Sequence, residues 1–399
     1  MITTFDESQA RQHQSLDYEI VGLLDRICRN LEITEAMSRL AEERYISIAH
    51  YLEEKDSSLA VHRPVIYPQG SAKIETTVKP IGENEFDVDV ICQLLLSERT
   101  SQTDFLNLLY DRLAARKCYT LKRMNRCVRV QYANEFHIDI TPGIADRNQG
   151  PENIFVTDKE LGRWKESNPK DYAKWFHAIA QIQPTLLYED RLFMRKFAAA
   201  EPLPARRFSK PTVNRIVQLL KRHRDLMFQG DKKAPISAII TTLTANSYAY
   251  HVRNGQFPNQ IEFLRTVVSD LPRFIVKIAG EEYVPNPRNP LEDYADKWKS
   301  APERREAFYA WHDKAILHLE GILQSLDKGK ESLFEKLALA YGTDAVKKAT
   351  IEEAEFRKFL TEKQQLGVSR KTGITAPIAA VAAIGASVLP VKTHTFHGS

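Results

Sequence analysis

Two aspartates separated by a single residue are the side chains in this sequence best suited to chemistry. Asp87 and Asp89 alternate with apolar residues in the run 86–91. Successive side chains of a strand point to opposite faces, so we expect both carboxylates on one face and the apolar residues in a core. Neighbouring carboxylates repel each other unless a cation lies between them, and Mg2+ prefers carboxylate and phosphate oxygens. The pair therefore predicts a magnesium site rather than a half-polar edge strand, where lysine is favoured over paired aspartate.

A third aspartate lies in a second alternating run. In residues 136–140, His137 and Asp139 share one face and the apolar residues share the other. If this strand lies beside 86–91, Asp139 completes a cluster of three carboxylates that can bind two Mg2+ ions. Two such ions stabilise the attacking and the leaving oxygens of a phosphoryl or nucleotidyl transfer.

A glycine and a serine precede the aspartate pair by about sixteen residues. Gly70 lets a backbone approach a phosphate closely. Ser71 can cap the short helix that we expect directly after it. A GlySer pair alone is a weak signal, but its spacing from Asp87 and Asp89 and the third aspartate make the combination specific for phosphate chemistry.

The residues around these motifs predict a sheet covered by helices. Apolar residues recur at helical spacing over about 16–55. Short alternating or β-branched runs then indicate strands, with one helix at about 105–116 between them. This order predicts an α+β lobe with a mostly antiparallel or mixed sheet. The expected strands are 65–67, 86–91, 127–132 and 136–140.

The second half of the sequence predicts a helical lobe. Helical patterns lie at about 160–180, 213–228, 235–253, 258–279, 302–325 and 331–365. We therefore expect an α+β protein of two lobes, in which a mixed-sheet lobe carries the catalytic motifs. The expected divisions are N-terminal helices with a spine helix at 1–60, a catalytic lobe at 61–155, a helical lobe at 156–365 and a flexible tail at 366–399.

Composition limits the class of protein. The chain has 399 residues, enough for two or three domains, and 43% hydrophobic with 27% charged residues excludes a wholly disordered or fibrous chain. Its four cysteines form no CxxC pair, so a structural zinc site is not expected and the thiols suit a reducing compartment. The polar N-terminus lacks the apolar core of a signal peptide, and no run is convincing as a membrane span. These features predict a cytoplasmic protein.

The motifs together resemble a known superfamily. GlySer at 70–71, AspXaaAsp at 87–89 and Asp139 resemble the signature of pol-β-like nucleotidyltransferases. Within them the chain is similar to the bacterial CD-NTases, relatives of animal cyclic GMP-AMP synthase and of oligoadenylate synthase. The resemblance extends over about residues 16–365, and the further matching stretches are 220–225, 235–237 and 284–298.

The resemblance implies an activity and roles for individual residues. It implies a magnesium-dependent enzyme that joins ATP and GTP into a cyclic oligonucleotide second messenger in bacterial anti-phage signalling, with the nucleotide held between two lobes. Asp87, Asp89 and Asp139 would bind two Mg2+ ions, and Asp139 would help to deprotonate the attacking hydroxyl. The residues that would hold the donor nucleotide are Gln69, Gly70, Ser71, Lys221 and Ser237.

Several of these residues also have a purely structural interpretation. Lys221 can be a solvated helix lysine, and Ser237 can be a helix N-cap after a proline. The AsnPro-rich stretch can simply form turns, and the basic stretch 191–233 can be a solvated surface. The weaker candidates for nucleotide or phosphate contacts are Asn286, Asn289, Glu292, Arg191, Arg195 and Lys196.

Three functions remain open within this resemblance. The first is a cyclic oligonucleotide synthase with a purine product that contains AMP, such as a cyclic trinucleotide with GMP. The others are a transferase that adds nucleotides to an RNA end or a small acceptor, and an inactive relative that binds nucleotide or RNA. The expected partners are ATP and other NTPs, with conjugation of the C-terminal end 396–399 or an operon-encoded regulator as further options. No membrane partner is expected, nor the zinc element with which the animal enzyme grips duplex DNA.

Overall fold

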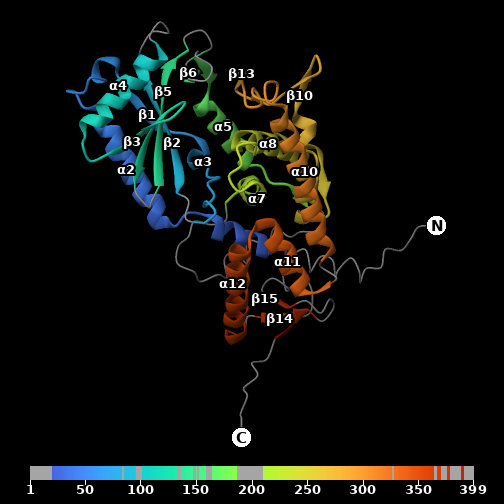
Figure 1. Ribbon diagram of the computed structural model, residues 1–399. Helices are drawn as coiled ribbons and strands as arrows, with labels where there is room; N and C mark the ends of the chain where they lie inside the picture. The colour runs from blue at the N-terminus through green and yellow to red at the C-terminus, as the bar shows by residue number, and fades with distance from the viewer. Residues whose placement is uncertain are drawn as a thin grey trace.

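The computed structural model has two lobes, each built around its own hydrophobic core. Figure 1 shows the sheet lobe on one side and a larger helical lobe on the other. This confirms the α+β class and the mixed sheet that the sequence predicts. The structure describes residues 20–82, 85–95, 101–132, 136–146, 150, 152–158, 164–186, 210–325, 328–363, 366–369, 375–377 and 388–390.

A seven-stranded mixed sheet forms the centre of the sheet lobe. Its central order is β1-β2-β5-β4-β3, with β6 on β5 and β7 on β6. Only β2 and β5 run parallel, and the other neighbours are antiparallel. The strands are β1 (Val65–Pro68), β2 (Phe86–Leu94), β3 (Thr120–Arg123), β4 (Val128–Tyr132), β5 (Phe136–Ala145), β6 (Ile154–Val156) and β7 (Lys165–Ser167).

One face of this sheet is buried against two helices. The helices are α2 (Glu35–Glu53) and α4 (Gln102–Ala115). Phe86 and Phe136 stack with ring centres 5.1 Å apart, and Tyr132 stacks on Phe136 at 5.2 Å. The apolar residues of β2 and β5 point into this core, as the alternation predicts, so their polar residues must point to the opposite face.

Among the described residues, seven helices after the sheet lobe pack around the apolar core of the helical lobe, together with the helix at 20–31. They are α5 (Pro169–Ala180), α7 (Thr212–Phe228), α8 (Ser237–Asn254), α9 (Gln260–Ser269), α10 (Pro302–Gln324), α11 (Lys330–Tyr341) and α12 (Thr343–Glu362). Shorter elements lie between these strands and helices: η1 (Ala60–His62), α3 (Gly70–Lys73), β8 (Thr185–Leu186), β9 (Gln256–Phe257), η2 (Leu271–Phe274), β10 (Val276–Ile278), β11 (Glu281–Tyr283), β12 (Pro285–Asn286) and β13 (Asn289–Asp293).

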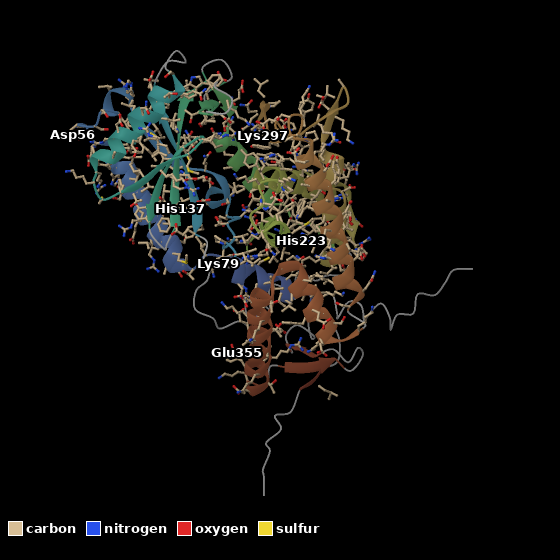
Figure 2. The ribbon with its side chains drawn as sticks, in the orientation of Figure 1. Asp56, Lys79, His137, His223, Lys297 and Glu355 are labelled. Carbon is tan, nitrogen blue, oxygen red and sulfur yellow. The ribbon has the colours of Figure 1, made fainter. Side chains whose placement is uncertain are left out.

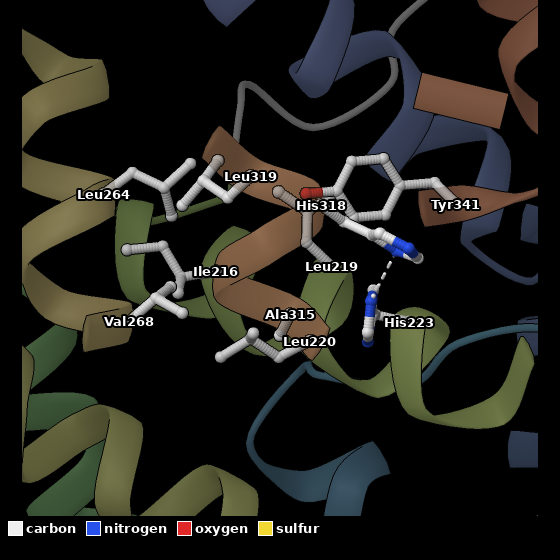
Figure 3. A pocket seen from close by; sticks show the side chains of 10 residues that line it. All are labelled: Ile216, Leu219, Leu220, His223, Leu264, Val268, Ala315, His318, Leu319 and Tyr341. Atoms are coloured by element: carbon white, nitrogen blue, oxygen red, sulfur yellow. Dashed lines mark hydrogen bonds between the residues drawn. The ribbon is translucent and has the colours of Figure 1, made fainter. Parts of the chain in front are cut away.

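A histidine pair joins α7 to α10 inside the helical lobe. His223 Nε2 lies 3.0 Å from His318 Nδ1 beside an apolar pocket, as Figure 3 shows. Burial lowers the pKa of His223 to about 4 and lowers the pKa of His318 as well. Both rings are therefore neutral near pH 7, and one donates to the other.

The N-terminal helices divide between the two lobes. Residues 20–31 are helical and bury Ile20, Leu24 and Ile27 in the core of the helical lobe. A break at 32–34 follows, and the Thr34 hydroxyl then accepts a hydrogen bond from the Met37 amide to cap α2. Because α2 packs on the sheet, the two helices described within the expected N-terminal unit at 1–60 have different partners. Its residues 1–19 lie outside the described chain.

Several element boundaries differ from those expected. Gly342, with φ +95°, separates α11 and α12 where a single helix was expected over 331–365. Only a glycine adopts that conformation readily. The break was not predicted because helical spacing of apolar residues continues on both sides of Gly342. The stretch 258–279 contains α9, η2 and β10, and the expected helix at 160–180 shortens to α5 because β7 precedes it.

The tail expected at 366–399 contains secondary structure. Three short strands form a sheet of order β15-β14-β16: β14 (Leu366–Ser369), β15 (Thr375–Pro377) and β16 (Val388–Pro390). The prediction of a wholly flexible tail is therefore wrong. Strands of three or four residues are too short to give a period, and their pairing partners lie up to 23 positions apart. The C-terminal stretch 396–399, expected as a conjugation site, lies outside the described residues.

None of the described helices combines the length and apolar character that crossing a membrane requires.

We expect Phe136→Ala to destabilise the sheet lobe strongly. The ring is 1% exposed and stacks on two other aromatic rings, so the change leaves a cavity where β2, β4 and β5 meet. Loss of a buried phenylalanine lowers the free energy of unfolding by about 3–5 kcal/mol. Urea unfolding followed by circular dichroism measures it. Leu317→Ala is the control, because Leu317 is 59% exposed and its loss should change stability by less than about 0.5 kcal/mol. Equal effects of the two changes would contradict the assignment of the core.

Candidate active site

Three carboxylates meet on the open face of the sheet. The parallel pairing of β2 with β5 sets Asp89 opposite Asp139 and Asp87 opposite His137. Since the apolar residues of both strands fill the core, these side chains share the other face. The expected adjacency of the two runs is thus confirmed, and it depends on this register, because a one-residue slip would bury the carboxylates.

An arginine that the sequence analysis did not single out binds two of the three carboxylates. Arg129 on β4 pairs in register with Asp139 on β5. Its Nε and Nη2 each donate to one oxygen of Asp139 at 2.7 Å, and Nη2 also lies 3.1 Å from Asp87 Oδ1. The signal was present in the sequence, because Arg129 alternates with apolar residues and must share the face of the aspartates.

The crowded carboxylates perturb one another. Burial, together with the charges of Asp139 and Asp87, raises the pKa of Asp89 to about 7, although Lys221 and Arg129 oppose the rise. Burial also raises the pKa of Asp87, against the attraction of Arg129. Asp89 is therefore only partly ionised near neutral pH until a positive charge reaches it.

The backbone of the turn at Gly70 lies very close to the Asp89 carboxylate. Gly70 has φ +62°, and a Cβ at this position would lie 2.5 Å from Asp89 Oδ2. The Gln69 amide donates to the Asp89 carbonyl at 2.9 Å, which fixes the turn against β2. Both the backbone conformation and the contact with the carboxylate therefore require glycine at position 70.

Ser71 does not cap a helix, contrary to expectation. It lies inside α3, whose N-cap is Gln69 with no side-chain capping bond. Its hydroxyl accepts a hydrogen bond from Thr77 Oγ1 at 3.3 Å. The prediction failed because α3 begins at Gly70, one residue before Ser71, rather than after it. The Ser71 hydroxyl can still donate to a phosphate oxygen.

Lys221 is buried rather than solvated. It is 6% exposed, and its Nζ donates to the carbonyl of Thr76 at 2.9 Å. Burial lowers the pKa of Lys221 to about 8, with Arg224 contributing in the same direction, while Asp225 and Asp89 oppose the shift. The structural interpretation as a surface lysine is therefore wrong, and a cationic side chain lies near the carboxylates.

Ser237 is joined to the same region through an arginine. It is the first residue of α8, and the N-cap is Ile236, so the interpretation of Ser237 as the N-cap is wrong. Arg224 Nη1 donates to Ser237 Oγ and to the Pro235 carbonyl, both at 3.0 Å. Because Arg224 also acts on the pKa of Lys221, the two candidate phosphate ligands share a neighbour.

The AsnPro-rich stretch forms a hairpin that holds the lobes together. Glu292 on β13 accepts hydrogen bonds from Ser167 Oγ at 2.9 Å, from the Asn168 amide at 3.1 Å and from Asn286 Nδ2 at 2.6 Å. Asn286 and Asn289 are 1% and 2% exposed. Glu292, held by Asn286, therefore fixes the junction of β7 and α5, whereas Asn289 Oδ1 accepts a hydrogen bond from the Leu291 amide at 3.2 Å. Arg191, Arg195 and Lys196 lie outside the described residues.

The carboxylates fit a divalent cation by their chemistry, although one of them is already bound. Within the described part of the chain, no three His, Cys, Asp or Glu side chains are arranged to hold a metal ion together. Both oxygens of Asp139 accept hydrogen bonds from Arg129. Asp87 is 48% exposed, and Asp89 lies beside it with a raised pKa that a cation would lower. Asp87 and Asp89 therefore fit Mg2+, and Asp139 can join when Arg129 releases an oxygen.

We expect Asp89→Asn to stabilise the protein in the presence of EDTA, increasingly so as the pH rises. The pKa of Asp89 is higher in the folded chain, about 7, than in an unfolded chain, about 3.8. The folded state therefore binds the proton more tightly, and wild type loses stability as the pH rises from about 4 to 7. Asparagine carries no such charge, so the gain at pH 8 should reach roughly 2–4 kcal/mol at about 1.4 kcal/mol per pKa unit. Urea unfolding at pH 5 and pH 8 measures it.

Asp313→Asn is the matched control for this measurement, because Asp313 is 83% exposed on α10. It should change stability by less than about 0.5 kcal/mol at both pH values. Parallel pH profiles of wild type and Asp89→Asn would show that Asp89 is ionised in the folded protein without penalty.

Comparison with known proteins identifies the family. The Second Messenger Oligonucleotide or Dinucleotide Synthetase domain matches residues 20–179. A c-di-GMP synthase of Roseivirga ehrenbergii is 32% identical over 367 aligned positions, which cover 89% of this chain and 90% of that protein. The cyclic dinucleotide synthase CdnG of Bradyrhizobium diazoefficiens is 24% identical over 401 positions, 94% of each chain.

A solved structure shares the fold. The CD-NTase CdnG of Bradyrhizobium diazoefficiens, in complex with GTP, matches with a TM-score of 0.64 at 23% identity and covers 85% of this chain and 99% of that one. Its similarity extends across both lobes, so the fold of the whole enzyme is shared. The chain therefore belongs to the CD-NTase family, the nucleotidyltransferases that make cyclic oligonucleotides.

Proposed function

We propose that this chain joins two molecules of GTP into c-di-GMP, with Mg2+ bound by Asp87, Asp89 and Asp139. The observation that carries the proposal is the meeting of these carboxylates with the Gly70 turn on one open face of the sheet. The names of the two relatives, a c-di-GMP synthase and a cyclic dinucleotide synthase, support the base and the ring size. This choice replaces the adenine-containing trinucleotide that we expected from sequence.

The donor triphosphate would be held by residues from both lobes. Ser71 offers a hydroxyl from the sheet lobe, and Lys221 offers an ammonium from α7. A lysine has three N–H donors, and one of those on Lys221 is used by the Thr76 carbonyl, so two can turn toward phosphate oxygens. A bound triphosphate would also raise the lowered pKa of Lys221, since it adds negative charge beside it.

Asp139 is the group we propose to take the proton from the attacking 3′-hydroxyl. The hydroxyl oxygen forms a bond to the α-phosphorus as the bond to the departing pyrophosphate breaks, and a second such transfer closes the ring. Mg2+ would neutralise the charge that develops on the phosphates. To accept a proton, Asp139 must lose one of its two hydrogen bonds from Arg129. Asp87, whose Oδ1 lies 3.1 Å from Arg129 Nη2, can accept a hydrogen bond from the N–H group that is released.

A role of the product in anti-phage signalling follows from the family resemblance, and a cytoplasmic location follows from the scattered cysteines and the polar N-terminus of the sequence. We propose both on these grounds. Bacteria that express the chain with its neighbouring genes should survive phage challenge better than bacteria that express a synthesis-dead variant. Equal survival would remove the anti-phage role and leave the synthase activity untouched.

We expect GTP and Mg2+ alone to give a cyclic product. The purified chain is incubated with each NTP and with all four, treated with phosphatase, and analysed by mass spectrometry. A phosphatase-resistant product with the mass of c-di-GMP supports the proposal. A resistant product that contains AMP would overturn the choice of base. A phosphatase-sensitive product would indicate the terminal transferase, and the absence of any product would indicate an inactive relative.

We expect Asp87→Asn combined with Asp89→Asn to abolish synthesis in a folded protein. The change removes the two carboxylates that we propose as ligands of the cation. It also relieves the repulsion between negative charges on the sheet face. Product formation and the unfolding midpoint are measured side by side. The control, Asp111→Asn with Asp313→Asn, removes the same charge from side chains that are 74% and 83% exposed. Synthesis at wild-type rate by the folded double variant would contradict the metal site.

A further inference from the structure

A stretch of irregular backbone directly after α3 has most of its carbonyl groups bound by side chains of the helical lobe. We call it the 74–79 segment. Most of its carbonyl groups accept a hydrogen bond from a side chain of α7, and the Lys73 carbonyl just before it lies 3.2 Å from His177 Nε2 on α5. Buried carbonyls outside regular structure need such partners. Figure 2 shows Lys79, the last residue of the segment, between the sheet lobe and the helical lobe.

The partners on α7 form one polar face. The donors are Asn214 to the carbonyls of Ile74 at 2.9 Å and Glu75 at 3.4 Å, Gln218 to Thr77 at 3.1 Å, Lys221 to Thr76 at 2.9 Å, and Arg222 to Lys79 at 2.7 Å. Positions 214, 218, 221 and 222 follow helical spacing, so they lie on one side of the helix. All four side chains are at most 8% exposed.

The α7 face can serve as a rigid support. The apolar residues of α7 from Val213 to Leu220 are buried in the core of the helical lobe, and His223 is bound to His318 on α10. Ile74 of the segment is 5% exposed and belongs to that same core, and Val78 packs against it. Movement of the segment would therefore break both its hydrogen bonds and its apolar contacts.

The segment is connected directly to the phosphate-binding turn. The Thr76 amide donates to the Ser71 carbonyl at 2.9 Å, and Thr77 Oγ1 donates to Ser71 Oγ at 3.3 Å. Glu75 has φ +58°, a conformation that a residue with a side chain adopts at some expense of free energy. The Asn214 contact with the Glu75 carbonyl helps to hold this strained backbone in place.

We propose that Asn214 and Gln218 are positioning residues for nucleotide transfer. They act through the 74–79 segment to hold Ser71 and Gly70 against Asp89, and they keep the Thr76 carbonyl where it orients the Lys221 ammonium. Neither of them needs to touch the substrate. This inference rests on the proposed function in one respect, because it assumes that the turn at Gly70 and Ser71 binds a nucleoside triphosphate.

The test replaces Gln218 by a side chain of similar shape that has no N–H. Gln218→Met removes the bond to Thr77 and also the acceptor at 3.3 Å from Arg215 Nη1, while it keeps the buried volume. The Michaelis constant for GTP should rise about tenfold, with a smaller fall in kcat, because the phosphate-binding turn is loosened and the carboxylates are not. Hydrogen exchange of the amides of 74–77 should become about tenfold faster. Asn214→Ala, a second variant on the same face, should change both quantities in the same direction.

Ser247→Ala is the matched control. Ser247 on α8 is also fully buried, and its hydroxyl also donates to a backbone carbonyl, that of Val267, at 2.8 Å. The control should lower the melting temperature by an amount similar to Gln218→Met, yet leave the Michaelis constant within about twofold and the exchange of 74–77 unchanged. A variant Gln218→Met that resembles Ser247→Ala in both readouts would overturn the proposal.

The experiment also separates this proposal from the proposed function. Hydrogen exchange and calorimetric titration with GTP need no turnover, so both can be measured on a chain that makes no cyclic product. Faster exchange and about tenfold weaker GTP binding in Gln218→Met would support the positioning role even then. Unchanged GTP binding and unchanged hydrogen exchange of 74–77 in Gln218→Met would contradict the positioning role, even if the wild-type chain makes c-di-GMP.

Discussion

The mutual repulsion of three carboxylates on one face of a sheet is the constraint on which this site depends. The parallel register of β2 and β5 brings Asp87, Asp89 and Asp139 together. Because both strands are fixed in the sheet, the three carboxylates cannot move apart to lower their repulsion. The protein meets the repulsion in two ways that are visible in the structure. Arg129 binds Asp139 with two hydrogen bonds and reaches Asp87, and Asp89 holds its proton to higher pH than an ordinary aspartate. The sheet can therefore fold around the cluster before any cation binds.

The sequence predicted the parts of the fold that depend on a repeating pattern. Alternation identified β2, β4 and β5 and the faces on which Asp87, Asp89 and Asp139 lie, and helical spacing identified α7, α8 and α10 closely. The same alternation contained Arg129, which was overlooked because a single arginine in a strand is ordinary until its neighbour across the ladder is known. The sequence does not give the register of the strands. Only the register of β4 and β5 shows that Arg129 lies opposite Asp139.

Features that depend on contacts distant in sequence were not predictable. The 74–79 segment is separated from α7 by about 140 positions, and its carbonyl groups leave no trace in the residue types. Glu292 was expected near the nucleotide, yet it accepts hydrogen bonds from Ser167 and the Asn168 amide and thereby joins two distant stretches of chain. A buried polar residue in a sequence indicates that a partner exists without saying whether it is a substrate or the protein's own backbone.

The arginine bound to Asp139 has a consequence for the order in which ligands assemble. A divalent ion from solution must displace a cation that is tethered to the neighbouring strand and cannot diffuse away, so its net gain at Asp139 is small. An ion that arrives already coordinated to a triphosphate brings extra oxygen ligands, and the phosphate charge gives Arg129 and Lys221 new anions to approach. If Asp139 binds Mg2+ as we propose, the third carboxylate would therefore join the metal site only when the nucleotide arrives, and the same encounter would complete the catalytic centre.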